Sequence, residues 1–224
     1  MKVKLINCSP DAENHIVEIA RVSSKRTDKK ADPDGLLNYL ITHNHWSPFE
    51  HAYFTVEIQT SKAIAIQLLR HRSFTFQEFS QRYSDVSILE NDNTNLHNWP
   101  EKFEPIELRR QAKSNRQSST DVMRKDWSNS KLTGPYAQIE KFLLDADWLY
   151  NSLLQQGVAR ECARMILPLA TKTKVHMTGS VRSWIHFLNI RDDSHAQKEI
   201  QLIAKEVKNI LTPKLPTISR KLNW

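Results

Sequence analysis

Apolar and polar positions along the chain recur in patterns that predict a mixture of strands and helices. Residues 52–60 alternate, with Phe54, Val56 and Ile58 on one side, and this period of two predicts a half-buried strand. In 180–190 the apolar side chains recur at helical spacing and would form one buried stripe. By the same criteria we expect strands at 2–6, 52–60 and 172–178, and helices at 9–22, 32–41, 61–69, 135–157, 158–166, 180–190 and 194–211.

Several helix ends are marked by residues that suit caps. Ser9-Pro10 and Asp32-Pro33 each place a capping side chain directly before a proline, which is favoured at the first helical position. Ser194 to Gln197 has the spacing of a capping box. Gly157 suits the end of the long helix that Pro135 opens.

The order of these elements shows no regular alternation of strand and helix, which indicates an α+β fold. We expect an antiparallel sheet flanked by helices. The 224 residues are enough for one substantial domain. Residues 91–132 are polar and lack apolar periodicity, so they are expected to be a functional loop or a partly disordered segment. Neither flank of that segment looks self-sufficient, and we therefore predict a single domain over 1–224.

Composition and charge narrow the function classes. The net charge of +7 and nine histidines suit anionic partners such as nucleic acid, phosphates or polyanionic cofactors. The four glycines cannot form a glycine-rich phosphate loop, so arginines and helix ends would have to hold any phosphate. No apolar run approaches the length of a membrane span, and the N-terminus does not have the pattern of a signal peptide. A cytoplasmic protein with no membrane partner is expected.

The cysteines do not indicate catalysis. Cys8 and Cys162 lie far apart in the sequence, which gives neither a disulfide framework nor the spacing of a metal site. We interpret them as inert thiols in a reducing compartment, and no metal is expected. A cysteine nucleophile is not favoured, because neither residue has an obvious His or Asp neighbour.

The run Arg70-His71-Arg72 follows an apolar helix and precedes a segment rich in phenylalanine. A solvated basic helix end is the ordinary interpretation of such a run, since cations there complement the helix dipole. Arginines set among leucines and aromatics are less easily solvated, and a cleft-lining arginine needs an anionic partner. The planar guanidinium group matches phosphate at two points, so we favour a phosphate ligand.

Two further groups of residues carry weaker indications. His43, His45 and His51 have spacings that fit no helical metal motif, and their loop instead suggests an aromatic surface for a flat ligand. Arg182 and His186 are one turn apart on a helix whose N-terminus could bind an anion. The alternative for that helix is a solvated polar face. Glu161 and Arg164, three residues apart, are interpreted as a surface ion pair in isolation.

Taken together, these segments resemble the flavin-dependent thymidylate synthases, also called thymidylate synthase-complementing proteins. The family motif is Arg-His-Arg, seven residues and Ser, and it is present as RHRSFTFQEFS in 70–80. Other matching stretches are ARVS (20–23), HWSPFEHAYFTV (45–56), ARECARMILPL (159–169) and VRSWIHFLNIRDDSHAQKEI (181–200). The resemblance implies conversion of dUMP to dTMP without a protein nucleophile. Methylenetetrahydrofolate would supply the carbon, and FAD reduced by NADPH would carry the hydride.

The resemblance also implies roles for individual residues, and a homotetramer with active sites at subunit interfaces. Residues implied to bind FAD are His45, Ser47, Glu50, Arg70, His71, Arg72, Glu78, Ser180, Val181, Arg182 and His186. Residues implied to bind dUMP are Gln67, Leu68, Leu69, Arg70, Glu78, Phe79, Ser80, Gln81, Arg82, Arg164 and Arg191. Arg191 is further implied to be catalytic, by polarising the uracil ring at N3.

The chain departs from the family pattern at a few positions. Ser180 stands where many members have Asn, and Gln81 replaces a smaller residue of the phosphate loop. The polar segment 91–132 is longer than in compact members. A relative that kept the fold and lost activity is one alternative. A basic nucleic-acid-binding protein is another, since it would explain the charge and the interleaved aromatics but not the agreement in spacing. We therefore expect no nucleic-acid partner.

Overall fold

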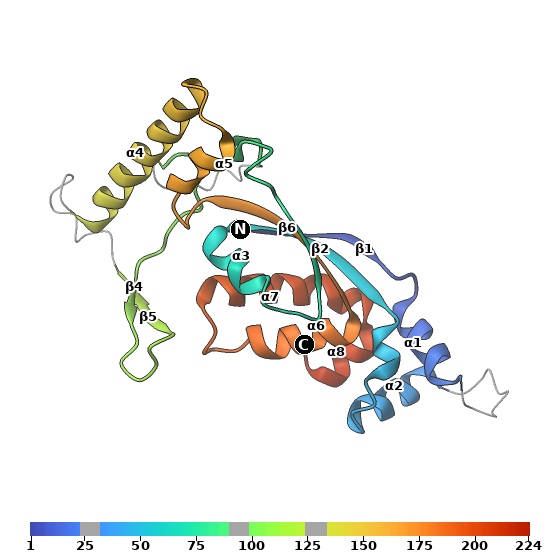
Figure 1. The fold of residues 1–224 in the computed structure, drawn as a ribbon. Helices are drawn as coiled ribbons and strands as arrows, with labels where there is room; N and C mark the ends of the chain where they lie inside the picture. The colour runs from blue at the N-terminus through green and yellow to red at the C-terminus, as the bar shows by residue number, and fades with distance from the viewer. Residues whose placement is uncertain (23–31, 90–98, 124–133) are drawn as a thin grey trace. The chain divides into compact units, whose positions relative to one another are not determined.

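The structure is a computed structural model that describes residues 1–22, 32–89, 99–123 and 134–224 (Figure 1). The chain divides into two compact units. Unit 1 consists of Met1, Gln59–Arg70 and Glu78–Val175, and unit 2 consists of Lys2–Ile58, His71–Gln77 and His176–Trp224. No helix that the structure describes is both long enough and apolar enough to cross a membrane.

The main sheet is antiparallel and has four strands in the order β1-β2-β6-β3. The strands are β1 (Lys2–Cys8), β2 (Tyr53–Ser61), β3 (Thr75–Glu78) and β6 (Lys172–Ser180), and most of their residues belong to unit 2. In β2 the side chains of Phe54, Val56 and Ile58 are buried, with at most 1% exposed. The predicted alternation is therefore confirmed. The prediction of an antiparallel sheet flanked by helices is confirmed as well.

The helices of unit 2 pack against one another and against this sheet. They are α1 (Ala12–Ala20), α2 (Pro33–Thr42), η1 (Ser47–Glu50), α6 (Val181–Arg191), α7 (Lys198–Leu211), η5 (Thr212–Lys214) and α8 (Pro216–Leu222). Helix α6 packs on α7, α7 packs on β1, and α2 packs on α8 (Figure 1). The apolar stripe of α6 is buried as predicted, and Trp184 donates its Nε1 hydrogen to the Phe54 carbonyl over 3.2 Å.

A close approach between backbone and ring lies next to α6. Gly179 directly precedes the helix cap, and a Cβ atom there would lie 2.4 Å from the ring of Phe74. Phe74 is itself packed edge-to-face on Trp184, with the ring centroids 4.7 Å apart. Glycine is therefore required at 179, because any side chain would displace a buried aromatic ring.

Unit 1 has a hydrophobic core of its own. Its elements are α3 (Lys62–Leu68), η2 (Val86–Ile88), β4 (Arg109–Gln111), β5 (Ser119–Val122), α4 (Pro135–Gln155), α5 (Arg160–Ala163) and η4 (Arg164–Ile166). Trp99 and Phe103 pack with Leu143 and Ala146 of α4. Strands β4 and β5 pair antiparallel as a separate hairpin. This hairpin lies in the segment 91–132, for which no strand was predicted, and the expectation of a functional loop or a partly disordered segment stays a prediction. The single-domain prediction over 1–224 stays a prediction.

Two of the predicted caps are wrong. Helix α1 is preceded by Asp11 in the left-handed region (φ 46°), while Ser9 extends the pairing of β1 by exchanging hydrogen bonds with Tyr53. The expected capping box fails because α7 begins after Gln197, which makes no side-chain cap bond. In contrast, Asp32 accepts a hydrogen bond from the Asp34 amide as predicted.

Candidate active site

The start of α6 is fixed by its own cap and by the sheet. The Ser180 hydroxyl accepts a hydrogen bond from the Ser183 amide (3.3 Å), and the Val181 amide donates to the Ala52 carbonyl (2.8 Å). Two of the first three N–H groups of the helix are therefore already used. The expectation that this end offers free backbone donors for an anion is wrong for those two groups, and the side chains of the first turn carry most of the binding capacity.

Glu50 connects this helix start to the turn η1. Ser180 Oγ donates to Glu50 Oε2 (3.2 Å), and Arg182 Nη1 donates to Glu50 Oε1 (2.7 Å). A cavity of about 750 Å³ lies here, and its lining brings together three residues predicted to bind the flavin. The lining residues are Asn44, Trp46, Glu50, Ser73, Arg182, Ser183, Ile185, His186 and Asn189. All of them belong to unit 2.

His71 and Arg191, separated by 120 residues, are hydrogen-bonded in unit 2. Arg191 Nε donates to His71 Nε2 over 2.9 Å, so His71 is an acceptor at that atom and carries its proton on Nδ1. The pKa of His71 is lowered from its ordinary 6.5 to about 4, mainly by burial and in smaller part by the charges of Arg191 and His186. The imidazole ring also packs edge-on against Phe187, at 5.1 Å between centroids. A neutral histidine thus fixes the guanidinium of Arg191.

The remaining residues predicted to bind FAD are placed unevenly. Ser47 opens η1, three residues before Glu50, and both Ser47 and Arg72 are exposed. Val181 is completely buried, so only its backbone could contact a ligand. His45 is exposed and lies beside a stacked pair formed by Tyr39 and His43. Among the described residues there is no group of three or more His, Cys, Asp or Glu side chains that could hold a metal ion.

A tight turn in unit 1 presents the residues predicted to hold the nucleotide phosphate. The Phe79 amide donates to the Lys174 carbonyl (2.8 Å), and the Ser84 amide donates to the Ser80 carbonyl (3.0 Å). Arg82 Nη2 lies 3.2 Å from Glu161 Oε2 in an exposed ion pair. Glu161 therefore pairs with Arg82 and not with Arg164 as its spacing suggested. A shallow cavity of about 410 Å³ is lined by Ser80, Arg82, Tyr83, Ala159, Arg160 and Glu161.

The other residues predicted to bind dUMP surround α3 and β3. Gln67, Leu68, Leu69 and Arg70 lie at the end of α3, and Glu78 ends β3. Leu68 is completely buried, so its side chain belongs to the core and not to a ligand surface. Gln81 is also buried, and its Nε2 atom has no hydrogen-bond partner among the described residues. Arg164 begins η4.

The two predicted sets divide between the units. Most flavin residues, and Arg191, belong to unit 2, whereas Arg70, Glu78 and the rest of the nucleotide set belong to unit 1. Lys62 and Thr173, which bind Glu78, were not found from the sequence. In the sequence, Lys62 is a polar residue at the start of a predicted helix and Thr173 is one in a predicted strand. Such positions are common in any protein and do not indicate a site. That the FAD residues and the dUMP residues come together in one active site stays a prediction.

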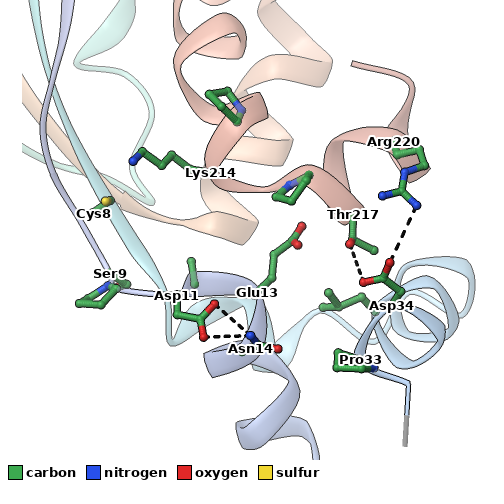
Figure 2. Close-up of a pocket in the computed structure, with 15 residues that line it drawn as sticks. Cys8, Ser9, Asp11, Glu13, Asn14, Pro33, Asp34, Lys214, Thr217 and Arg220 are labelled. Carbon is green, nitrogen blue, oxygen red and sulfur yellow. Dashed lines mark hydrogen bonds and ion pairs between the residues drawn. The ribbon is translucent and has the colours of Figure 1, made fainter.

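A further cavity of about 650 Å³ in unit 2 contains none of the predicted site residues (Figure 2). Glu13 accepts a hydrogen bond from the Ile218 amide (2.8 Å), and Asp34 accepts one from the Thr217 hydroxyl (2.7 Å). Arg220 also lies 3.8 Å from Asp34. Burial raises the pKa of Glu13, against hydrogen bonds that lower it. The carboxylates at this cavity thus join α1 and α2 to the start of α8.

Comparison with known proteins places the chain in a family. Residues 4–217 match the family model described as thymidylate synthase complementing protein. The chain is 39% identical over 218 residues to a probable flavin-dependent thymidylate synthase of Paramecium bursaria Chlorella virus 1, covering 95% of this chain and 91% of the relative. It is 40% identical over 215 residues to the flavin-dependent thymidylate synthase of Synechocystis, covering 95% of this chain and 90% of the relative.

A solved structure is similar to the chain over nearly its whole length. A UMP/dUMP methylase, PolB from Streptomyces cacaoi bound with 5-Br UMP, superposes with a TM-score of 0.77 at 26% identity. The superposition covers 99% of this chain and 93% of that protein. With the Arg-His-Arg motif on the loop before β3 and the family model spanning nearly the whole chain, the protein belongs to the flavin-dependent thymidylate synthase family.

Proposed function

We propose that the protein converts dUMP to dTMP, with methylenetetrahydrofolate as the carbon donor and FAD, reduced by NADPH, as the hydride carrier. The observation that carries this proposal is the cavity at the start of α6, where Glu50, Arg182 and His186 meet in a member of this family. No step in this proposal uses Cys8 or Cys162 as a nucleophile.

The residues of unit 2 fit a flavin nucleotide. The cavity volume is within the range of ligand sites, about 300–1,000 Å³. Its lining supplies a cation in Arg182, a flat aromatic surface in Trp46 and polar donors in Asn44 and Asn189. Arg182 is only half-buried and can turn from Glu50 toward a phosphate. FAD, when bound, supplies hydride transfer, and the protein supplies binding and orientation.

Arg191 is proposed to stabilise negative charge on the uracil ring. Its Nε is held by His71, which fixes the plane of the guanidinium before the substrate arrives. Donors that are fixed in advance stabilise developing charge without reorganising during the reaction. His71 can do this only while it is neutral, and its lowered pKa keeps it so at neutral pH.

Arg82 and Arg164 are proposed to hold the dUMP phosphate in unit 1. Arg82 is exposed beside the shallow cavity next to Ser80, whose hydroxyl is a further donor. Arginine can bind phosphate through two parallel hydrogen bonds, which sets the orientation of the nucleotide.

The absorbance spectrum of the purified protein tests the proposal. We expect flavin bands that are released on denaturation and that shift when dUMP is added, together with dTMP formation from dUMP, methylenetetrahydrofolate and NADPH. A colourless protein that binds random oligonucleotides with an affinity falling steeply with salt would instead support the nucleic-acid alternative.

We further propose that the protein is a cytoplasmic homotetramer with active sites shared between subunits. Helix α4 supports an interface, because Phe142, Leu144, Trp148 and Leu149 are exposed on it, Trp148 by 71%. Leu144 and Trp148 are one turn apart and share a face of α4, and an exposed apolar face marks a protein contact. Light scattering of the protein in solution would measure the assembly, and a monomer at micromolar concentration would contradict it.

A further inference from the structure

The carboxylate of Glu78 is held by two side chains that have no role in the proposed function so far. Lys62 Nζ donates to Glu78 Oε1 over 2.8 Å, and Thr173 Oγ1 donates to the same oxygen over 2.9 Å. The donors come from different elements, since Lys62 opens α3 and Thr173 lies in β6. All three residues belong to unit 1.

Burial makes this group more than a surface ion pair. The side chains of Lys62 and Glu78 are each only 24% exposed, and Thr173 is completely buried. Exposed pairs contribute little, whereas a shielded pair with a second donor has a fixed geometry. Glu78 Oε2, by contrast, accepts no hydrogen bond from any residue that the structure describes. The carboxylate is therefore fixed through one oxygen, and the other is available to a ligand.

The charge of Glu78 needs an explanation at this place in the chain. Glu78 begins the segment, through Arg82, that is proposed to bind dUMP. An uncompensated carboxylate close to a phosphate dianion would weaken binding by Coulomb repulsion. Lys62 offsets this charge, whereas Thr173 contributes a hydrogen bond without charge. Lys62 can therefore both neutralise and orient the Glu78 carboxylate, whereas Thr173 can only orient it.

We propose that Lys62 is a positioning residue for nucleotide binding. It holds Glu78 Oε1 and offsets the carboxylate charge, so that Glu78 Oε2 accepts a hydrogen bond from a sugar hydroxyl of the nucleotide. Thr173, in β6, helps to hold the Glu78 carboxylate in the same orientation. This inference rests on the proposed function, because it assigns a contact to the substrate of that site.

The test measures the dissociation constant of dUMP with the FAD-loaded protein, followed by steady-state rates. Lys62→Met is expected to weaken dUMP binding about tenfold, which corresponds to about 1.4 kcal/mol. At saturating dUMP, kcat should fall by less than about threefold, because Lys62 acts through Glu78 and not on the reacting atoms. Lys62→Arg should restore most of the affinity. Thr173→Val should cost about threefold, since it leaves no charge uncompensated.

Lys113→Met is the matched control, because Lys113 is an exposed lysine of the same unit between β4 and β5. It should leave the dUMP dissociation constant unchanged. In the Glu78→Gln background, Lys62→Met should cause no further loss of affinity, because no carboxylate remains to be offset or held. Losses that add in this double variant would overturn the proposal.

The controls keep two failures apart. A wild-type protein that binds no dUMP overturns the proposed function itself. A wild-type protein that binds dUMP while Lys62→Met binds it equally well overturns only the role of Lys62. If Lys62→Met does not fold, judged by thermal unfolding, Thr173→Val carries the test, and an unchanged dUMP dissociation constant in that variant contradicts the proposal.

Discussion

The residues of unit 2 that are proposed to bind flavin are held differently from the residues of unit 1 that are proposed to bind phosphate. In unit 2, His71 packs against Phe187 and accepts from Arg191, and Glu50 is bound through one oxygen to the buried cap Ser180. In unit 1, Arg82 is 65% exposed and pairs with a Glu161 side chain that is 56% exposed. Within the first set, His71 and Ser180 are ordered by the core beneath them, although Arg182 and Glu50 are 52% and 45% exposed. The second set is ordered mainly by solvent-exposed contacts.

This difference has a consequence for binding. A site that is already in its bound geometry loses little conformational freedom when a ligand arrives, whereas exposed arginines must be immobilised by the ligand. We therefore expect His71 and Arg191 to be in their bound geometry before any ligand arrives, whereas Arg182 and Arg82 become ordered when their ligands bind.

The largest effect is expected for Arg191→Ala, which removes the guanidinium that His71 holds in place. Loss of a fixed donor to the uracil ring should lower kcat by about 100- to 1,000-fold while FAD remains bound. Product formation and flavin content after gel filtration measure the two effects. Turnover like that of the wild type would refute the role of Arg191, and loss of FAD would show that it acts on the cofactor instead.

Arg182→Ala should weaken FAD retention about tenfold or more, because it removes the only arginine or lysine among the described residues that line the cavity at the start of α6. Flavin content after gel filtration is the measurement. Glu50→Gln keeps the shape of the partner side chain and removes its charge, so it separates the arginine from the ion pair and should change retention much less. Equal loss in both variants would mean that the ion pair, and not the arginine itself, holds the cofactor.

The pH dependence of stability tests the neutral state of His71. Its pKa is about 4 in the folded protein and 6.5 ordinarily. As the pH falls from about 6.5 to about 4, the unfolded chain takes up a proton that the folded protein does not, so the free energy of unfolding decreases. Urea unfolding at pH 7 and at pH 4.5 should show a smaller decrease in His71→Gln than in the wild type. Equal decreases would mean that folding does not lower the pKa of His71.

The smallest expected effect concerns the exposed pair in unit 1. In the proposed site Glu161 would compete with the dUMP phosphate for Arg82, so we expect Glu161→Gln to tighten dUMP binding about two- to threefold, as suits an exposed ion pair. Titration with dUMP at low and at high salt measures this. Weaker binding in Glu161→Gln would show that Glu161 orients Arg82 for the phosphate and does not compete with it.

The fold could be predicted from the sequence where the periodicity of apolar residues was strong. Prediction failed where contacts between distant segments determine the local structure. The apolar stripe of α6 and the alternation in β2 were predicted correctly, because each element has one apolar face and one polar face. The capping role of Ser9 was wrong, since pairing with Tyr53 in the neighbouring strand competes for the same hydroxyl. Three- and four-residue strands such as β4 and β5 are too short to show a period, and the hairpin was missed.

For the candidate site, the sequence indicated residue types but not their partners. Arg182 and His186 could be placed on one face of a helix from their spacing alone. The bond from Arg191 to His71 spans 120 residues, and the one from Arg182 to Glu50 spans 132, so no local pattern contains them. Lys62 was missed for the same reason, because its importance depends on a carboxylate that only the folded chain brings within reach.

The contact between Gly179 and the ring of Phe74 limits how this enzyme could be redesigned. Gly179 precedes the cap of α6, and Phe74 follows the Arg-His-Arg motif by two positions. The close packing of Gly179 and Phe74 therefore fixes the start of α6 against the segment that carries the motif. A methyl group at 179 would force the motif away from the helix, and only a smaller side chain at 74 would make room for it. Variation at these two positions should therefore be found together or not at all.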